Sequence, residues 1–198
     1  MRSPLALLAL LAAAILVTGC AFTTSKLDIT YSVDQAGPLA AVAPREVSVG
    51  PFTDKRPDVA RIGHKKNGFG QKTADILPAR PVAEIVRDAI AAELAKNGHR
   101  AAATAAPALA LSGDVTEFWF DLAVGVFTIE YTGRVGATVN IRDPSGGPVL
   151  TKRYQGVQVE KRMAGYEGAW TEVMNTALSK MVREMSTDPE LVDALARK

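Results

Sequence analysis

The sequence predicts a single α+β domain, in which an antiparallel or mixed sheet carries helices packed on one face. Two hydrophobic periods alternate along the chain, one of two residues, typical of half-buried strands, and one of three to four, typical of amphipathic helices. The 198 residues are 47% hydrophobic and 22% charged, which suffices for one sizeable core. The three longest strand patterns follow one another directly, so they predict a three-strand meander.

The first half of the domain is expected to contain two strands and one helix. Alternating apolar and polar residues predict strands at 27–33 and 45–52. The segment 53–80 shows no sustained period and predicts a long loop. A stripe of apolar residues at helical spacing then predicts a helix over 81–97, ended by Asn97-Gly98.

The second half supplies the meander and the remaining helices. Three strand patterns occur in succession, at 109–122, 127–142 and 149–160. Gly156 is expected to form a β-bulge, because the apolar phase of the last strand changes there. Apolar residues from Trp170 to Met185 predict a helix, and the sequence 187–190 opens a short last one. The predicted order is ββαβββα plus a short C-terminal helix.

The N-terminus is typical of a bacterial lipoprotein signal. Arg2 precedes an apolar run over 5–17, which is too short to span a bilayer comfortably. Val17-Thr18-Gly19-Cys20 has the pattern of a lipobox, in which the cysteine is acylated and becomes the new N-terminus after cleavage. We therefore expect a signal peptide at 1–19, a lipidated Cys20 with a short tether at 20–26, and one domain at 27–198.

The predicted lipid anchor limits the partners that the protein can meet. Lipid on Cys20, the single cysteine, anchors the protein to a membrane. Ala21 and Phe22 follow, and the absence of aspartate there favours the outer membrane, with the domain on its periplasmic face. The formal net charge of +2 gives no reason to expect nucleic acid. Envelope proteins and anionic lipid are the partners considered besides the anchoring membrane.

The inventory of catalytic residues is small, and we expect no enzyme, no metal and no cofactor. The chain has two histidines, His64 and His99, and no zinc, P-loop, dinucleotide or serine-hydrolase motif. His64 with Asp54 or Asp58 is the one local pairing of interest, and it has no evident nucleophile beside it.

The predicted loop is the first candidate binding element, because its basic residues outnumber its acidic ones. Its candidate residues are Asp54, Arg56, Asp58, Arg61, His64, Lys65 and Lys66. A positive surface here could meet anionic headgroups or a protein partner. We favour a second interpretation, a solvated loop pinned internally by pairs of Asp54 with Arg56 or Arg61.

Two further features could mark contacts. Trp119 alternates onto the face of Glu117 and Asp121, opposite Phe118 and Phe120, so it is either partly exposed for an interface or covered by another element. The turn from Leu122 to Phe127, which includes Val124, is apolar. Such a turn inserts in a membrane, meets a partner or lies under another segment, and we favour the buried alternative.

A family resemblance rests on the residues around the candidate loop. Val49-Gly50-Pro51-Phe52, Asp54, Arg56-Pro57-Asp58, Ile62-Gly63 and Lys66-Asn67-Gly68 resemble a signature of YajG-type lipoproteins. The resemblance implies a small α+β domain on a lipid anchor, with no established enzymatic activity and no assigned ligand. The expected function is a non-enzymatic interaction or envelope-maintenance role. The alternative is an auxiliary binding module of a lipid-transport or lipopolysaccharide-assembly complex.

Overall fold

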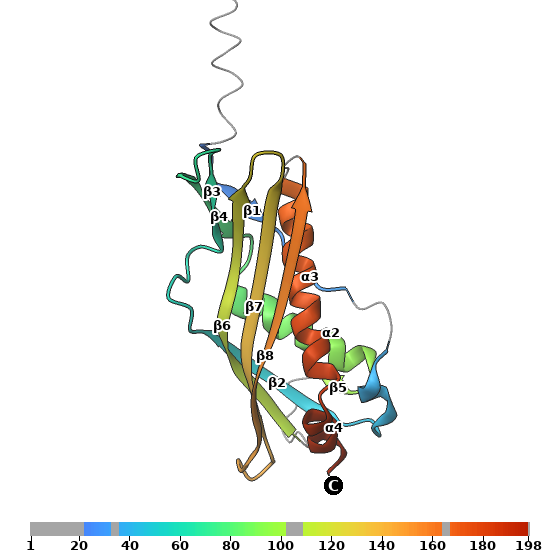
Figure 1. Cartoon of the computed structure of the whole chain (residues 1–198). Coiled ribbons are helices and arrows are strands. Elements are labelled where there is room, and N and C mark those ends of the chain that lie inside the picture. Colours follow the sequence, from blue (N-terminus) through green and yellow to red (C-terminus); the bar gives the residue numbers. More distant parts are fainter. Residues whose placement is uncertain (1–21, 33–35, 102–108, 164–166, 198) are drawn as a thin grey trace, which may run out of the picture.

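The computed structural model describes residues 22–32, 36–101, 109–163 and 167–197. They form an α+β domain with one mixed, eight-stranded sheet, and the helices pack against one of its faces (Figure 1). This architecture confirms the predicted fold class. Cys20 and the predicted signal peptide lie outside the described residues.

The elements are as follows. The strands are β1 (Ser25–Leu27), β2 (Glu46–Asp54), β3 (Gly63–Lys66), β4 (Lys72–Pro78), β5 (Arg100–Ala101), β6 (Leu109–Val124), β7 (Ile129–Arg142) and β8 (Pro148–Arg162). The helices are the short 3-10 helix η2 (Pro38–Ala41) and the α-helices α2 (Val82–Lys96), α3 (Glu167–Ser186) and α4 (Pro189–Ala196).

Strand β6 organises the sheet. Along one edge it pairs antiparallel with β7 over nearly its whole length, and β7 pairs antiparallel with β8, as the predicted meander requires. Along its other edge β6 pairs parallel with β2 in its first half and with β3 near Phe120. The sheet therefore divides beyond β6, with β5 next to β2 on one branch and β4 and β1 next to β3 on the other.

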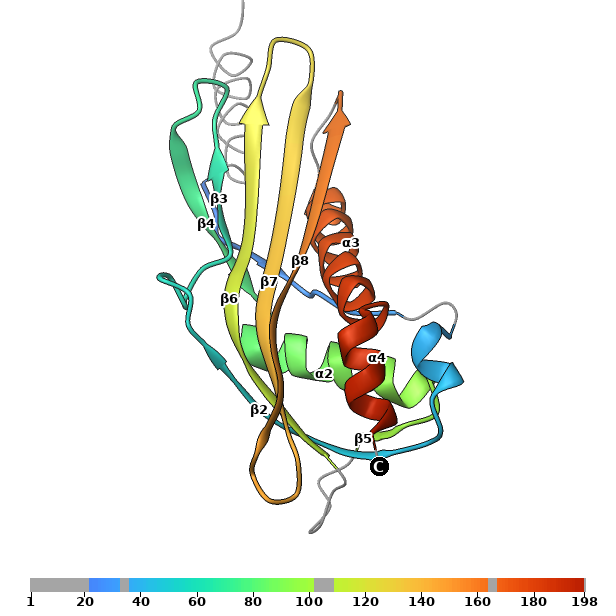
Figure 2. The ribbon, with the colours of Figure 1, turned by 60° about the horizontal axis from the view of Figure 1, so that its bottom comes forward.

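The core lies between the sheet and the helices. Side chains from the inner face of the meander, such as Phe118, Phe120 and Tyr131, are fully buried. Helix α3 runs along β7 and β8 and buries Met174 and Met181 against them, while α2 packs on β2 (Figure 2). The other face of the meander carries no helix of the described residues, as expected for a sheet with helices packed on one face (Figure 1).

Gly156 does not form the expected bulge. It pairs with Val135 in an unbroken register, and the register shift between β7 and β8 lies near Arg142 instead. A Cβ atom on Gly156 would lie 2.0 Å from the carbonyl oxygen of Ala177, so glycine is needed here because α3 approaches the strand closely. The apolar Val157 and Val159 consequently stay on the outer face, where they are half-exposed.

The first strand is shorter than the predicted 27–33 and begins earlier, so the predicted and observed strands share only Leu27. Only Ser25–Leu27 pairs, parallel to Ile76–Pro78 of β4. The alternating burial nevertheless continues, because Ile29 is buried and the backbone N–H of Thr30 donates to Asn175 of α3.

The prediction of one long loop at 53–80 is wrong. Strands β3 and β4 form an antiparallel hairpin in which His64 faces Asp75. Its turn is closed by Asn67, whose Oδ1 accepts the backbone N–H groups of Phe69 and Gln71, and Gly70 takes the required positive φ of 76°. Only the segment between β2 and β3 remains a loop.

Candidate functional site

Arg56 organises the loop between β2 and β3. Its guanidinium is buried and donates five hydrogen bonds. Two go to Asp54, and the others go to the carbonyl oxygens of Val59, Arg61 and Phe118. These contacts hold the loop on β6, and one of them spans 62 residues of sequence. The structure thus contains the Asp54–Arg56 pair that the interpretation as an internally pinned loop expects.

Asp58 accepts hydrogen bonds from backbone N–H groups further along the loop. Its Oδ1 accepts the backbone N–H groups of Ala60 and Arg61, at 3.2 and 3.1 Å. The side chain of Arg61 lies 3.4 Å both from Oδ2 of Asp58 and from Oδ2 of Asp75. The loop is therefore folded by its own charges.

His64 pairs with a different acid from the two proposed. Its Nδ1 lies 3.2 Å from Oδ1 of Asp75 across the hairpin, so the pairing with Asp54 or Asp58 is wrong. A hydrogen bond from Lys72 lowers the pKa of Asp75, burial opposes this, and the charge of Arg61 adds to the lowering. The ring of His64 also meets Trp119 edge-to-face, with centroids 5.3 Å apart.

Lys65 and Lys66 point to opposite faces of the sheet, so they do not form one positive surface. Lys65 is buried, and its Nζ lies 3.0 Å from Glu167 of α3 and over the ring of Trp170. Hydrogen bonds from Ser25 and Lys65 lower the pKa of Glu167. Lys66 instead donates to Asp121 and to the carbonyl oxygen of Leu122.

Trp119 lies on the outer face of the sheet, as its alternation predicts. Glu117 and Asp121 share this face, while Phe118 and Phe120 are buried on the other. The side chain is partly exposed, and within the described part of the chain the α-helices pack on the opposite face (Figure 1). Of the two alternatives for Trp119, the partly exposed one is therefore the one observed.

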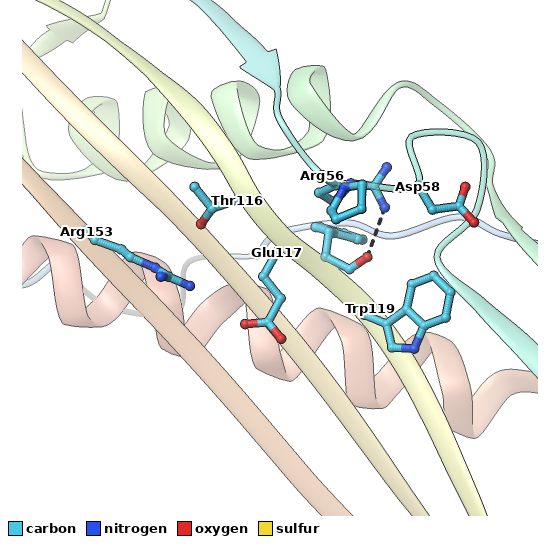
Figure 3. A pocket seen from close by; sticks show the side chains of 8 residues that line it. Arg56, Asp58, Thr116, Glu117, Trp119 and Arg153 are labelled. Atoms are coloured by element: carbon cyan, nitrogen blue, oxygen red, sulfur yellow. Dashed lines mark hydrogen bonds between the residues drawn. The ribbon is translucent and has the colours of Figure 1, made fainter.

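A hollow of about 440 Å³ opens beside Trp119 (Figure 3). It is lined by Arg56, Pro57, Asp58, Thr116, Glu117, Phe118, Trp119 and Arg153. It lies at a bulge in β6 between Val115 and Glu117, where Thr116 is the extra residue and the register with β7 shifts. The Oγ1 atom of Thr116 is buried without a hydrogen-bond partner.

The hollow combines three kinds of group. Trp119 and Pro57 supply apolar surface, Asp58 and Glu117 supply carboxylates, and Arg153 supplies a guanidinium. This composition suits one side chain or backbone segment of a partner, which it can stack against and hydrogen-bond.

Of the residues that line the hollow, the sequence predicts Arg56, Asp58 and Trp119 as binding residues, and it has no signal for Thr116 or Arg153. Thr116 is recognisable only from the bulge, and Arg153 reaches the hollow through the register of three strands, Asp114 to Thr138 to Arg153. No local pattern signals either residue.

The apolar turn between β6 and β7 is exposed, which overturns the favoured interpretation that it is buried. Val126 and Phe127 are 90% and 83% exposed, and Val124 is less exposed than either.

Among the described residues, no group of His, Cys, Asp and Glu is placed to hold a metal ion. None of the described helices has the length and hydropathy to cross a membrane.

Comparison with known proteins identifies the family but no activity. No curated protein matches the sequence significantly. The crystal structure of protein XCC0632 from Xanthomonas campestris, of the family DUF330, is similar at a TM-score of 0.61 and 12% identity, covering 86% of this chain and 96% of that one. A minor lipoprotein from Acinetobacter baumannii is similar at a TM-score of 0.41 and 10% identity, over 70% of this chain and 91% of that one.

The family assignment rests on the sequence. The model of a family described as "Uncharacterized lipoprotein" matches residues 47–196, which include the Asp54-to-Asp58 loop and the whole meander. The match confirms the resemblance to YajG-type lipoproteins. The chain therefore belongs to the Lipoprotein_16 family of uncharacterized lipoproteins.

Proposed function

We propose that this lipoprotein is anchored through Cys20 to the periplasmic face of the outer membrane and binds a partner protein on the outer face of its meander. It performs no chemistry of its own in this proposal. The observation that carries the proposal is the outer face of β6, β7 and β8, on which none of the described α-helices packs (Figures 1 and 2).

The composition of this face supports a protein partner. Trp119, Arg134 and Val157 are paired in register across the three strands, so their side chains form one row. Tryptophan and arginine are the residues most enriched among those that dominate protein–protein binding energy. The next row contains Asp121, Thr132 and Val159, which is half-exposed.

The hollow supports the same conclusion. It is an open depression at one end of the row, and small-molecule sites are usually enclosed clefts that bury most of their ligand. A depression beside a flat strand surface fits one anchoring side chain of a larger partner. The charges of Arg56 and Asp54 beneath it are already paired, so they support the surface and are not free to bind.

The alternative function, an auxiliary lipid- or lipopolysaccharide-binding module, would be favoured by a pocket between helices and sheet. In this structure buried side chains such as Phe118, Tyr131, Met174 and Met181 fill that layer. The open face is therefore the stronger observation.

Site-specific photo-crosslinking in the native cell tests the proposal. A photoreactive amino acid is placed at Val157 or Val159 of the lipidated protein, both half-exposed on the outer face, and the control position is Arg183, exposed on α3. We expect a specific protein adduct from the first two positions that Arg134→Glu greatly reduces. Equal adducts from position 183, or none from the sheet face, would contradict the proposal.

Membrane fractionation tests the anchoring separately. The protein should sediment with outer-membrane vesicles. A form in which residues 1–20 are replaced by a signal peptide that is cleaved without acylation should appear in the soluble periplasmic fraction. If that form stays in the outer-membrane fraction, the lipid is not what anchors the protein.

A further inference from the structure

Five large apolar side chains stand in solvent at one end of the domain. Phe22, Phe69, Val126, Phe127 and Met163 are between 68% and 91% exposed. We call these five residues the apolar end. Isolated exposed apolar residues are common, but a cluster at one end of a molecule indicates a contact surface.

The topology brings these residues together from separate segments. Val126 and Phe127 form the turn from β6 to β7, and Met163 follows β8, whose last residue pairs with Ile129 of β7. The turn of the β3–β4 hairpin, which carries Phe69, lies beside them because β3 runs parallel to β6. Both views show the two turns and the end of β8 at the same end of the sheet (Figures 1 and 2).

The described chain starts at this end as well. Strand β1 runs parallel to β4, and Ser25 is level with Ile76, so Phe22 lies towards the hairpin turn. Cys20 precedes Phe22 by two residues. An extended chain spans at most about 3.6 Å per residue, so its length limits the distance between the Cα atoms of Cys20 and Phe22 to about 7 Å.

We infer that the apolar end docks into the lipid bilayer to which Cys20 is anchored. The inference rests on the proposed anchoring, and it adds a fixed orientation to it. A tethered domain could also swing freely above the membrane, whereas a docked one stands with its strands upright. Phenylalanine, valine and methionine at the tips would enter the interface between headgroups and acyl chains.

The charges around the apolar end favour an apolar rather than an electrostatic contact. The basic side chains nearby pair with acids, as Lys66–Asp121, Lys72–Asp75, Lys161–Glu130 and Arg162–Glu160. Neutral and anionic bilayers should therefore be bound alike, and salt should matter little. This differs from the anionic-lipid surface that the lysines suggested in the sequence.

The turns are built to present these side chains. In the β3–β4 turn, Asn67 holds the backbone on both sides of Phe69. In the β6–β7 turn, the N–H of Gly125 donates to the carbonyl oxygen of Thr128 at 2.8 Å. Docking thus loses little conformational entropy.

The orientation fixes the height of the candidate binding face. Trp119 precedes the end of β6 at Val124 by five residues, which is about 17 Å at 3.3–3.4 Å per residue. A partner on this face would thus be held close to the membrane surface.

A fluorescent label reports whether the apolar end meets lipid. Cys20 is the single native cysteine, and acylation consumes its thiol, so an introduced cysteine is the sole site for a nitrobenzoxadiazole label. The lipidated protein carries Phe69→Cys or Phe127→Cys, with Ser145→Cys at the opposite end as the control, in neutral phosphatidylcholine vesicles. We expect a blue-shifted emission and quenching by brominated lipid at positions 69 and 127, and neither at 145.

A matched pair of variants tests the energetics. The label is placed at Val126→Cys, and the test variant carries both Phe69→Ser and Phe127→Ser. This double substitution should lower the ratio of lipid-contacting to water-exposed label at least about tenfold, because the burial of each phenylalanine in lipid is lost. Val59→Ser, which removes an exposed apolar side chain outside the apolar end, should not change it.

The outcomes separate the inference from the proposed anchoring. Labels at 69 and 127 that stay as water-exposed as the label at 145, on protein that remains on the vesicles, would overturn the docking alone. Protein that fails to associate with vesicles would overturn both. A blue shift without quenching by brominated lipid would show that a second protein molecule covers the apolar end, and would also overturn the inference.

Discussion

The guanidinium of Arg56 meets the carboxylate of Asp54 at two points, with Nε–Oδ1 and Nη2–Oδ2 distances of 2.9 and 2.7 Å. The arginine side chain is 3% exposed. A buried charge of this kind is tolerated because its donors are satisfied by the carboxylate and by carbonyl oxygens of the loop and of β6. Two residues of the family signature therefore form this pair, and Arg56 also binds the loop to β6.

We expect Arg56→Lys to lower the free energy of unfolding by about 2–3 kcal/mol. Lysine keeps the charge but loses the planar fork, so several of the carbonyl contacts are lost in a buried site. Urea denaturation measures the change. The matched control is Arg80→Lys, because Arg80 pairs with Asp88 while exposed to solvent, and it should cost less than about 1 kcal/mol. Equal costs would refute the role of the buried fork.

We expect Gly156→Ala to destabilise the protein by more than about 2 kcal/mol, because the new Cβ would overlap the backbone of α3 at Ala177 and Met181. Thermal or urea unfolding measures it. Gly68→Ala, where nothing lies within 4 Å of the new atom, should be neutral or slightly stabilising. A neutral Gly156→Ala would mean that α3 does not approach the strand so closely.

We expect Lys65→Glu to cost about 3–5 kcal/mol, because it places a buried carboxylate against Glu167. Lys66→Glu should cost roughly 1 kcal/mol, because that side chain is more exposed and lies on the other face. The charge-swapped pair Lys65→Glu with Glu167→Lys should recover part of the loss in a double-mutant cycle. Absence of any recovery would show that the two residues are not coupled.

We expect the stability to fall in acid. Hydrogen bonds from Ser25 and Lys65 lower the pKa of Glu167. Burial opposes ionisation of Asp188, but hydrogen bonds from Tyr154, Lys152 and the backbone of Glu190 together outweigh it, so the pKa of Asp188 is also lowered. A depressed carboxyl pKa stabilises the fold above the ordinary carboxyl pKa of about 4 and loses that contribution as the pH falls through the native value.

Unfolding at a series of pH values measures this dependence. The free energy of unfolding should be flat near neutral pH and fall below about pH 4. Glu167→Gln should flatten part of the acid slope at some cost in stability at neutral pH. An unchanged slope would show that the pKa of Glu167 is not depressed in the folded protein.

We expect Trp119→Ala to separate binding from stability. The side chain is partly exposed on the outer face, so its loss should reduce the free energy of unfolding by roughly 1 kcal/mol or less. It should nevertheless reduce the partner adduct formed from position 157 strongly. Loss of the fold, or an unchanged adduct, would contradict the role of the row Trp119–Arg134–Val157.

The strong periodic patterns were enough to predict much of the fold. The helix after Pro81, the meander and the helix that contains Trp170 all match, because long segments with one buried face carry their burial in their own sequence. The placement of Trp119 on the outer face follows from the same alternation.

The hairpin of β3 and β4 could not be found in this way. Strand β3 has the sequence Gly-His-Lys-Lys. The charge of its buried Lys65 is stabilised by Glu167, which lies 102 residues further along the chain. The hairpin is joined to the rest of the sheet by the pairing of β3 with β6 and of β4 with β1. Such long-range pairing leaves no local period. The error at Gly156 has the same origin, since the helix that requires glycine lies elsewhere in the sequence.

The parallel pairing of β1 with β4 also determines how the domain bears tension. A pull on the N-terminus enters at Phe22 and acts along the axis of β1, so the hydrogen bonds between Ser25–Leu27 and Ile76–Pro78 are loaded together in shear. Ser25 is further tied to Glu167, and Thr30 to Asn175, so the force passes directly into α3. The junction with the N-terminal segment is thus held by hydrogen bonds to the sheet and to a helix at once.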